Sequence, residues 1–276
     1  MDSSKTRHNE RPVKWLVLAL VSVGTFMSTL DASIVTVAMP TLTSAFNTTV
    51  VVSQWYVLAY TFAVTIFLLM FGKLGDMAGR RRLYVCGIVV FTAGSAVCGF
   101  SISSLMLILA RALQGVGSAM VMSCGPALVT DAFGPQERGK SLGLIGTAVA
   151  FGLLAGPVVG GMIIQYATWR WMFFINIPIG IALVSMMLAR VHGFDERRNG
   201  PLDIRGAVLM ALALAFLLSA ATFGSRFGWG SWLTISLFAA SGVLAALFIA
   251  AERAAQAPIL DLRLFREREF AIGTVA

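Results

Sequence analysis

The sequence predicts an all-α integral membrane protein, in which lipid rather than water surrounds most of the chain. Its 276 residues are 58% hydrophobic and only 12% charged, whereas a soluble domain is about 45–50% apolar and about 25% charged. Eight apolar stretches reach the roughly 20 residues that a helix needs to cross a bilayer. Strands of a membrane barrel would be shorter, at about 9–11 residues, so the lengths indicate helices.

The apolar stretches also predict how the chain is organised. They lie near residues 15–38, 51–71, 83–101, 104–129, 141–165, 171–190, 204–223 and 231–251, and a ninth begins at Phe270. The predicted parts are a cytoplasmic tail (1–14), a six-helix bundle (15–190), a cytoplasmic linker (191–203), a transmembrane hairpin (204–251), and a cytoplasmic segment with the start of a ninth helix (252–276). The linker is predicted from a cluster of charges with Gly and Pro.

The net charge of +8 is distributed unevenly between the two sides of the predicted bundle. Of the 21 Lys and Arg residues, all but three lie in the tails, loops or helix ends of the side that carries the N-terminus. Arg170 and Arg226 lie on the other side, and Arg111 lies inside a helix. By the positive-inside rule this predicts a multi-pass protein of the plasma or inner membrane with a cytoplasmic N-terminus. No basic stretch is long enough to form a nucleic-acid-binding domain of its own.

The sequence offers no pattern typical of an enzyme, a metal site or a bound cofactor. Cys86, Cys98 and Cys124 fall inside apolar stretches without paired spacing, which is typical of buried thiols. His8 and His192 have no ligand cluster around them. There is also no nucleophile–base pair and no phosphate loop, so we expect a protein that is not an enzyme.

Two ionisable residues, Asp31 and Arg111, fall well inside predicted helices. A charge in the middle of a membrane costs at least about 2.5–3.5 kcal/mol, so such a residue normally has a partner or a task. Both residues lie roughly 10–13 Å below the predicted outer face, at 1.5 Å per residue, and this permits pairing. A static ion pair and a proton-sensitive pair both fit, and Gln114, one turn after Arg111, can join either. We favour the proton-sensitive pair because buried ion pairs stabilise proteins poorly.

The loop between the second and third predicted helices, residues 72–82 (GKLGDMAGRRR), carries the first recognisable motif. It resembles the signature loop of the major facilitator superfamily. The motif positions are Gly72, Asp76, Gly79, Arg80 and Arg81. The glycines permit a tight turn, and the arginines suit the anionic side of a bilayer. Met77 departs from the family pattern, which usually has a basic residue there.

Further motifs resemble those of drug:proton antiporters in this superfamily. Residues 30–40 resemble their first-helix motif, residues 107–117 their fourth-helix motif, and residues 152–161 their fifth-helix antiporter motif, with Gly152, Gly156, Pro157, Gly160 and Gly161. Residues 54–60, 169–180, 201–206 and 258–265 are similar to the fourteen-helix branch of EmrB/QacA type. Glycines four apart allow close helix packing, and Pro157 bends or weakens its helix.

This resemblance implies the N-terminal portion of a multidrug efflux transporter, with a six-helix bundle and a hairpin but without the C-terminal bundle. It implies export of amphipathic or cationic small molecules, and hence antibiotic resistance, in exchange for protons, with the proton as coupling ion and no cofactor. Asp31 is then the proton- or cation-sensing carboxylate and Arg111 its coupling partner, while Gln114 and Tyr60 are weaker candidates for lining the cavity. Transport would require the missing C-terminal half or a second copy, since alternating access needs two bundles.

One structural expectation and two alternative functions accompany this interpretation. We expect the face of the fifth helix that carries Gly152, Gly156 and Gly160 to be exposed and apolar, because it would pack on the C-terminal bundle. A non-transporting truncated remnant or accessory membrane subunit is one alternative function. An exporter of a specific metabolite or sugar is the other, since the sequence encodes the substrate only weakly.

Overall fold

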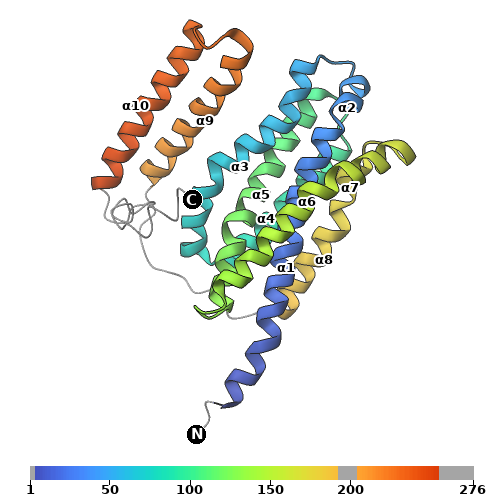
Figure 1. Cartoon of the computed structure of the whole chain (residues 1–276), viewed down its shortest axis with the longest axis vertical. Coiled ribbons are helices and arrows are strands. Elements are labelled where there is room, and N and C mark those ends of the chain that lie inside the picture. Colours follow the sequence, from blue (N-terminus) through green and yellow to red (C-terminus); the bar gives the residue numbers. More distant parts are fainter. Residues whose placement is uncertain (1–3, 192–203, 255–276) are drawn as a thin grey trace. The chain divides into compact units, whose positions relative to one another are not determined.

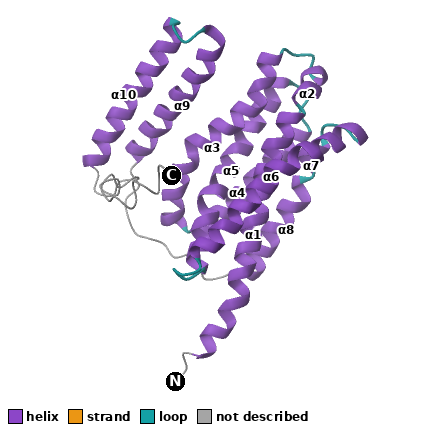
Figure 2. Cartoon of the chain, viewed as in Figure 1, coloured by secondary structure: helices purple, strands orange, loops and turns teal. Residues whose placement is uncertain are grey.

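The structure, a computed structural model, describes residues 4–191 and 204–254 as helices joined by short turns (Figures 1 and 2). Eight of these helices are long and apolar enough to span a membrane, which confirms the predicted all-α membrane fold. The predicted linker lies outside the described residues apart from Val191, and the predicted final segment lies outside them from residue 255 onward, including the ninth helix.

The helices form two separate units. The first contains α1 (Ser4–Val37), α2 (Met39–Ala45), α3 (Val50–Ala78), α4 (Arg80–Gly99), α5 (Ser104–Ala132), α6 (Arg138–Tyr166), α7 (Trp171–Phe174) and α8 (Asn176–Arg190). The second contains α9 (Ile204–Phe227) and α10 (Trp232–Ala254). The helix α1 begins at Ser4 rather than near residue 15, so it extends into the predicted tail. Its apolar part begins only at Val13, and sequence composition marks the apolar part alone.

The helices α1 and α5 form the centre of the first unit. In each of them 56% of the most apolar stretch is buried, against 17% in α3 and α6. The helix α5 packs along α3 and α4 and also contacts α1, while α1 packs along α6 (Figure 1). Polar side chains on α1 and α5 therefore face one another inside the bundle rather than lipid.

Two glycines determine how α4 sits against its neighbours. Gly79 separates α3 from α4 with a φ of 102°, a conformation that residues with a side chain rarely adopt. Gly94 lies against α5, where an added Cβ would meet the Gln114 Cα at 2.9 Å. The backbones of α4 and α5 are therefore in contact at this level, which places the neighbouring Ser95 beside Gln114.

The glycine row of α6 faces α1, so the expectation that this face is exposed is wrong. Gly152, Gly156 and Gly160 are all buried. A Cβ on Gly156 would lie 2.2 Å from the Ser33 hydroxyl oxygen of α1, and that hydroxyl donates a 2.9 Å hydrogen bond to the Leu153 carbonyl oxygen. The physical reason is that a groove without side chains accepts a neighbouring helix from the same bundle.

The opposite side of α6 carries its exposed apolar residues, Phe151, Leu154, Val158 and Met162. Gly161, the last glycine of the motif, also faces away from α1, because nothing lies within 4 Å of an added Cβ. Pro157 lies inside α6, and the helix continues through it to Tyr166. Three glycines of the motif, Gly152, Gly156 and Gly160, thus pack on α1, whereas Gly161 faces open space.

The second unit is a helical hairpin. Its turn contains Gly228 with a φ of 93°, and Ser231 accepts the first-turn hydrogen bond from the Thr234 backbone N–H at 3.2 Å. Between the two helices, Ser241 of α10 donates to the Ala213 carbonyl oxygen of α9 at 2.9 Å. The remaining surface is mostly apolar, as expected of a hairpin in lipid.

Replacing Gly156 with Ala is expected to destabilise the first unit, because the added methyl group collides with Ser33. Overpacking of this kind costs about 1–3 kcal/mol. The matched variant Gly161→Ala places a methyl group in open space and is expected to be neutral or slightly stabilising, since Ala is the better helix former. Denaturant unfolding in detergent micelles measures both variants. Equal stabilities would contradict the described packing of α6 on α1.

Candidate functional site

Asp31 of α1 and Arg111 of α5 form a buried ion pair inside the first unit. The Arg111 Nη1 atom donates to Asp31 Oδ2. The Asp31 side chain is 1% exposed and the Arg111 side chain is 0% exposed. The pairing that equal depth permits is therefore present. An isolated charge in such surroundings is strongly disfavoured, so each residue depends on the other.

The guanidinium of Arg111 is held by more than the carboxylate. Its Nε donates to the Tyr56 carbonyl oxygen of α3 at 2.8 Å, and Nη1 also donates to Gln114 Oε1 at 2.6 Å. Its Cζ lies 4.3 Å from the centroid of the Tyr60 ring, a cation–π contact. The position of Arg111 is thus set by α3 and α5 as well as by Asp31.

The Asp31 carboxylate accepts two further hydrogen bonds from neutral amides. Gln114 Nε2 donates to Asp31 Oδ1 at 2.8 Å, and Asn176 Nδ2 donates to the same oxygen at 2.9 Å. Ser95 Oγ lies between the amides, 2.7 Å from the Gln114 nitrogen and 3.3 Å from the Asn176 nitrogen. Each amide is oriented so that its N–H group stabilises the negative charge on the carboxylate.

Five helices contribute to this site: α1, α3, α4, α5 and α8. Sequence reasoning identified Asp31, Arg111 and Gln114, which the structure brings together, but it did not assign a role to Ser95 or Asn176. Asn176 had a usable signal, since it is a buried amide at the start of an apolar helix. Ser95 had none, because a single Ser in an apolar helix is common.

Tyr60 lies in the core beneath the guanidinium and is 5% exposed. Its hydroxyl donates to the Ser28 carbonyl oxygen at 3.0 Å and also lies 2.7 Å from the Ser118 hydroxyl. These contacts connect α3 with α1 and α5. Tyr60 therefore supports Arg111 from below in this structure, and its expected role as a cavity-lining residue stays a prediction.

The loop motif forms a second charged cluster, at the other end of α5. Arg80 donates through Nε to Asp76 Oδ1 at 2.8 Å, and its Nη1 lies 2.7 Å from both carboxylate oxygens of Asp131. Asp131, near the end of α5, was not anticipated from the sequence. The cluster connects the turn between α3 and α4 to α5, so it and the Asp31 site share three helices.

The remaining motif residues have different roles. Arg81 Nη2 donates to the carbonyl oxygens of Met187 and Leu188 at 3.2 and 3.3 Å, near the C-terminal end of α8. Basic side chains are favourable at such a position, where helix carbonyls lack partners. Gly72 lies in α3, and nothing lies within 4 Å of an added Cβ there. Gly79 supplies the turn described above.

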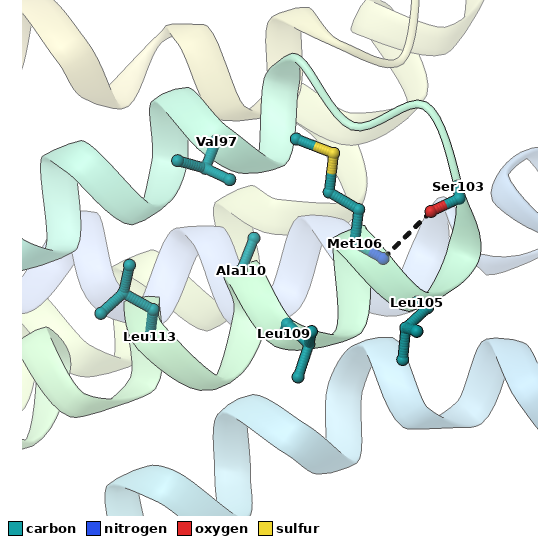
Figure 3. A pocket seen from close by; sticks show the side chains of 7 residues that line it. All are labelled: Val97, Ser103, Leu105, Met106, Leu109, Ala110 and Leu113. Carbon is teal, nitrogen blue, oxygen red and sulfur yellow. Dashed lines mark hydrogen bonds between the residues drawn. The ribbon is translucent and has the colours of Figure 1, made fainter.

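A groove on the surface of the first unit contains none of the predicted site residues. It lies between α4 and α5 and is lined by Val97, Ser103, Leu105, Met106, Leu109, Ala110 and Leu113 (Figure 3). Its polar feature is the helix cap at the start of α5, where the Met106 backbone N–H donates to Ser103 Oγ at 3.2 Å. The exposed leucines make this groove a surface suited to lipid chains.

The described residues contain no group of three or more His, Cys, Asp or Glu side chains that could hold a metal ion. The polar groups that the structure brings together at the site are the ion pair, the two amides and the Ser95 hydroxyl beside them. Such groups can stabilise a charge, exchange a proton or bind a cation.

A sequence model for the Major Facilitator Superfamily matches residues 21–253, which include every residue of this site. The chain belongs to the major facilitator superfamily. This membership places the chain in a family of membrane transporters and agrees with the multi-pass membrane protein that the sequence predicted. The motif of the α3–α4 turn thus occurs in a chain of the superfamily that it resembles, while the antiporter character of the α6 motif stays a prediction.

Several transporters are similar to this chain over nearly its whole length. It is 37% identical over 264 residues to the riboflavin transporter RibZ of Clostridioides difficile, covering 95% of this chain and 56% of RibZ. It is 32% identical to the multidrug transporter protein MdtP of Bacillus subtilis, covering 96% and 49%. It is 34% identical to the multidrug resistance protein Stp of Mycobacterium tuberculosis, covering 94% and 48%. The chain spans about half the length of these relatives.

Two solved structures share the fold. The human organic anion transporter MFSD10 matches with a TM-score of 0.58 at 19% identity, covering 75% of this chain and 55% of that structure. A bacterial homologue of the lysosomal transporter Spinster, in an inward-facing conformation, matches with a TM-score of 0.53 at 14% identity, covering 85% and 60%. At these identities the likeness concerns the fold alone.

Replacing Arg111 with Gln is expected to destabilise the protein by about 3–5 kcal/mol, because it leaves a buried carboxylate without its counter-charge. The double variant Asp31→Asn, Arg111→Gln is expected to recover part of this loss, since neither charge then remains. A double-mutant cycle from denaturant unfolding in micelles measures the coupling. Additive effects of the two substitutions would contradict the ion pair.

Proposed function

We propose that this chain is the N-terminal portion of a proton-coupled multidrug efflux transporter, a drug:proton antiporter. The observation that carries the proposal is the buried Asp31–Arg111 pair, held in the centre of the bundle by Gln114 and Asn176. An ionisable pair at this depth, surrounded by neutral donors, is arranged for a charge that changes during a transport cycle.

The proposed proton exchange at Asp31 depends on the groups that contact its carboxylate. Arg111 and two amides donate hydrogen bonds to the Asp31 carboxylate. A conformational change that moves Arg111 away leaves the carboxylate in a low-dielectric site, where taking up a proton neutralises it. A cationic substrate that replaces the guanidinium would release that proton again. Proton uptake and substrate binding are then mutually exclusive, which is the requirement for antiport.

The direction of transport and the wider architecture are part of this proposal. The antiporter motif of α6 and the relatives named as multidrug transporters support efflux of amphipathic or cationic compounds. We assign the chain to the fourteen-helix branch, with α9 and α10 as the hairpin between two bundles. The basic loops support a location in the cell membrane with the N-terminus in the cytoplasm. The partner of the first unit is then a C-terminal bundle or a second copy.

A second candidate is a transporter for one specific metabolite, because RibZ, a riboflavin transporter, is 37% identical to this chain. A multidrug transporter is expected to move structurally unrelated cations such as ethidium, whereas a riboflavin transporter is expected to move the flavin alone. Competition between ethidium and riboflavin in liposomes that contain the full-length transporter separates the two candidates.

Replacing Asp31 with Asn in the full-length transporter is expected to abolish substrate movement driven by a pH gradient, because Asn cannot take up the proton. Fluorescence of ethidium in proteoliposomes with an imposed pH gradient measures the loss. The control is Glu137→Gln, which removes a carboxylate that is 49% exposed and paired with Lys14. It is expected to retain most of the activity. Unchanged coupling in Asp31→Asn would exclude the proposed mechanism.

The 276-residue chain expressed alone is expected to confer no drug resistance, because alternating access moves one bundle against another. Growth of a drug-sensitive host that expresses the chain, with the full-length transporter as the positive control, tests this. Resistance from the chain alone would require that it assembles a complete transporter from copies of itself. If the full-length protein also confers no resistance, the alternative of an accessory subunit or remnant is favoured instead.

A further inference from the structure

Asn176 approaches Asp31 from α8, a helix that the first-helix and fourth-helix motifs do not include. It is 1% exposed, and its Nδ2 atom lies 2.9 Å from Asp31 Oδ1 and 3.3 Å from Ser95 Oγ. The helix α8 begins at Asn176, and Pro178 lies in its first turn, where a missing backbone N–H is tolerated. The sequence therefore fixes this amide at the start of a helix, beside the carboxylate.

Gln114 and Asn176 donate to the same carboxylate oxygen but differ in their freedom to turn. The Gln114 Oε1 atom accepts from Arg111 Nη1 at 2.6 Å, so turning this amide would place its NH₂ group against the guanidinium. Within residues 4–191 and 204–254, no hydrogen bond is made to the Asn176 Oδ1 atom, since its contacts involve only Nδ2. Turning the Asn176 amide therefore breaks only its contacts through Nδ2, and the Ser95 hydroxyl can donate to the carbonyl oxygen that takes the place of Nδ2.

We propose that Asn176 is a positioning residue that sets the proton affinity of Asp31 by presenting a donor to the charged form and an acceptor to the protonated form. The inference rests on the proposed function, in which Asp31 takes up a proton. The proton adds to Oδ1, while Oδ2 stays toward Arg111. The new O–H group needs an acceptor, and a half-turn of the Asn176 amide supplies its carbonyl oxygen. The Asp31 carboxyl group then has a partner for its charge in one state and a partner for its O–H group in the other.

The helices packed against α1 contribute few other groups that could account for such an effect. Arg111 of α5 and Tyr60 of α3 are coupled electrostatically to Asp31, and Cys98 of α4 is the other titratable neighbour. Among the described residues, α6 has no titratable residue between Lys140 and Tyr166, and α8 has none before Arg190. Among the side chains of α8, only the Asn176 amide can therefore affect the proton affinity of Asp31.

The test is infrared difference spectroscopy of the protein in lipid nanodiscs, titrated between about pH 5 and pH 9. The carboxylic C=O band that is lost in Asp31→Asn identifies Asp31. Asn176→Leu, similar in size but unable to form hydrogen bonds, is expected to raise the proton affinity about tenfold, since it removes a donor to a charged group. The C=O band is expected to shift as well, because the O–H group loses its acceptor. Asn176→Gln retains an amide and is expected to restore the midpoint in part.

Thr92→Val is the matched control, because it removes a hydroxyl from the contact between α4 and α8 without touching Asp31. Its midpoint is expected to equal that of the unsubstituted protein. Asn176→Ala is measured in parallel, so that the result does not depend on the folding of one variant. If Asp31 titrates but both Asn176 variants match Thr92→Val, the role of Asn176 is excluded and the proposed function stands. If the Asp31 band does not titrate at all, both are excluded.

Discussion

The ion pair between Asp31 and Arg111 is the interaction on which the arrangement of the first unit depends. Both side chains are almost fully buried among side chains that are otherwise uncharged, and neither charge is tolerable there alone. Their remaining hydrogen-bonding groups must be satisfied within the protein, because lipid offers neither donors nor acceptors. A backbone carbonyl of α3, an amide of α5 and an amide of α8 contact the pair directly, a hydroxyl of α4 contacts the two amides, and only the Arg111 Nη2 atom of the guanidinium has no hydrogen-bond partner among the described residues. The pair therefore constrains the mutual positions of five helices.

Close helix packing makes this arrangement possible. Gly94 lets the backbone of α4 touch α5 at Gln114, so that Ser95 reaches the amide. The glycine row of α6 lets α1 settle against it, which positions the helix that carries Asp31. Without a hydrophobic driving force between helices in lipid, such surfaces of small residues supply van der Waals contact and short approach distances. Small residues at these two contacts therefore bring the helix backbones close to the polar site.

The two charged clusters of the first unit are connected through shared helices. Arg111 and Asp131 both lie on α5, while Asp76 lies on α3, the helix that also supplies Tyr56 and Tyr60. A movement of α5 relative to α3 and α4 would therefore strain the contact of Arg80 with Asp131 and the contact of Arg111 with Tyr56. This is a physical route by which the turn between α3 and α4 and the buried pair can respond to one another. The hairpin of α9 and α10 forms its own unit.

The sequence by itself determined the environment, the eight spans and the identity of the two buried charges, because apolar length and an isolated charge are local properties of the chain. It also gave Asp31 and Arg111 equal depth, since rise per residue is fixed in a helix. Only the tertiary structure decided which helix covers the glycine row of α6, because every face of α6 is apolar or small and sequence periodicity cannot name its neighbour. For the same reason it alone brought Asn176 to Asp31 and to Ser95, since these two contacts join residues 145 and 81 positions apart.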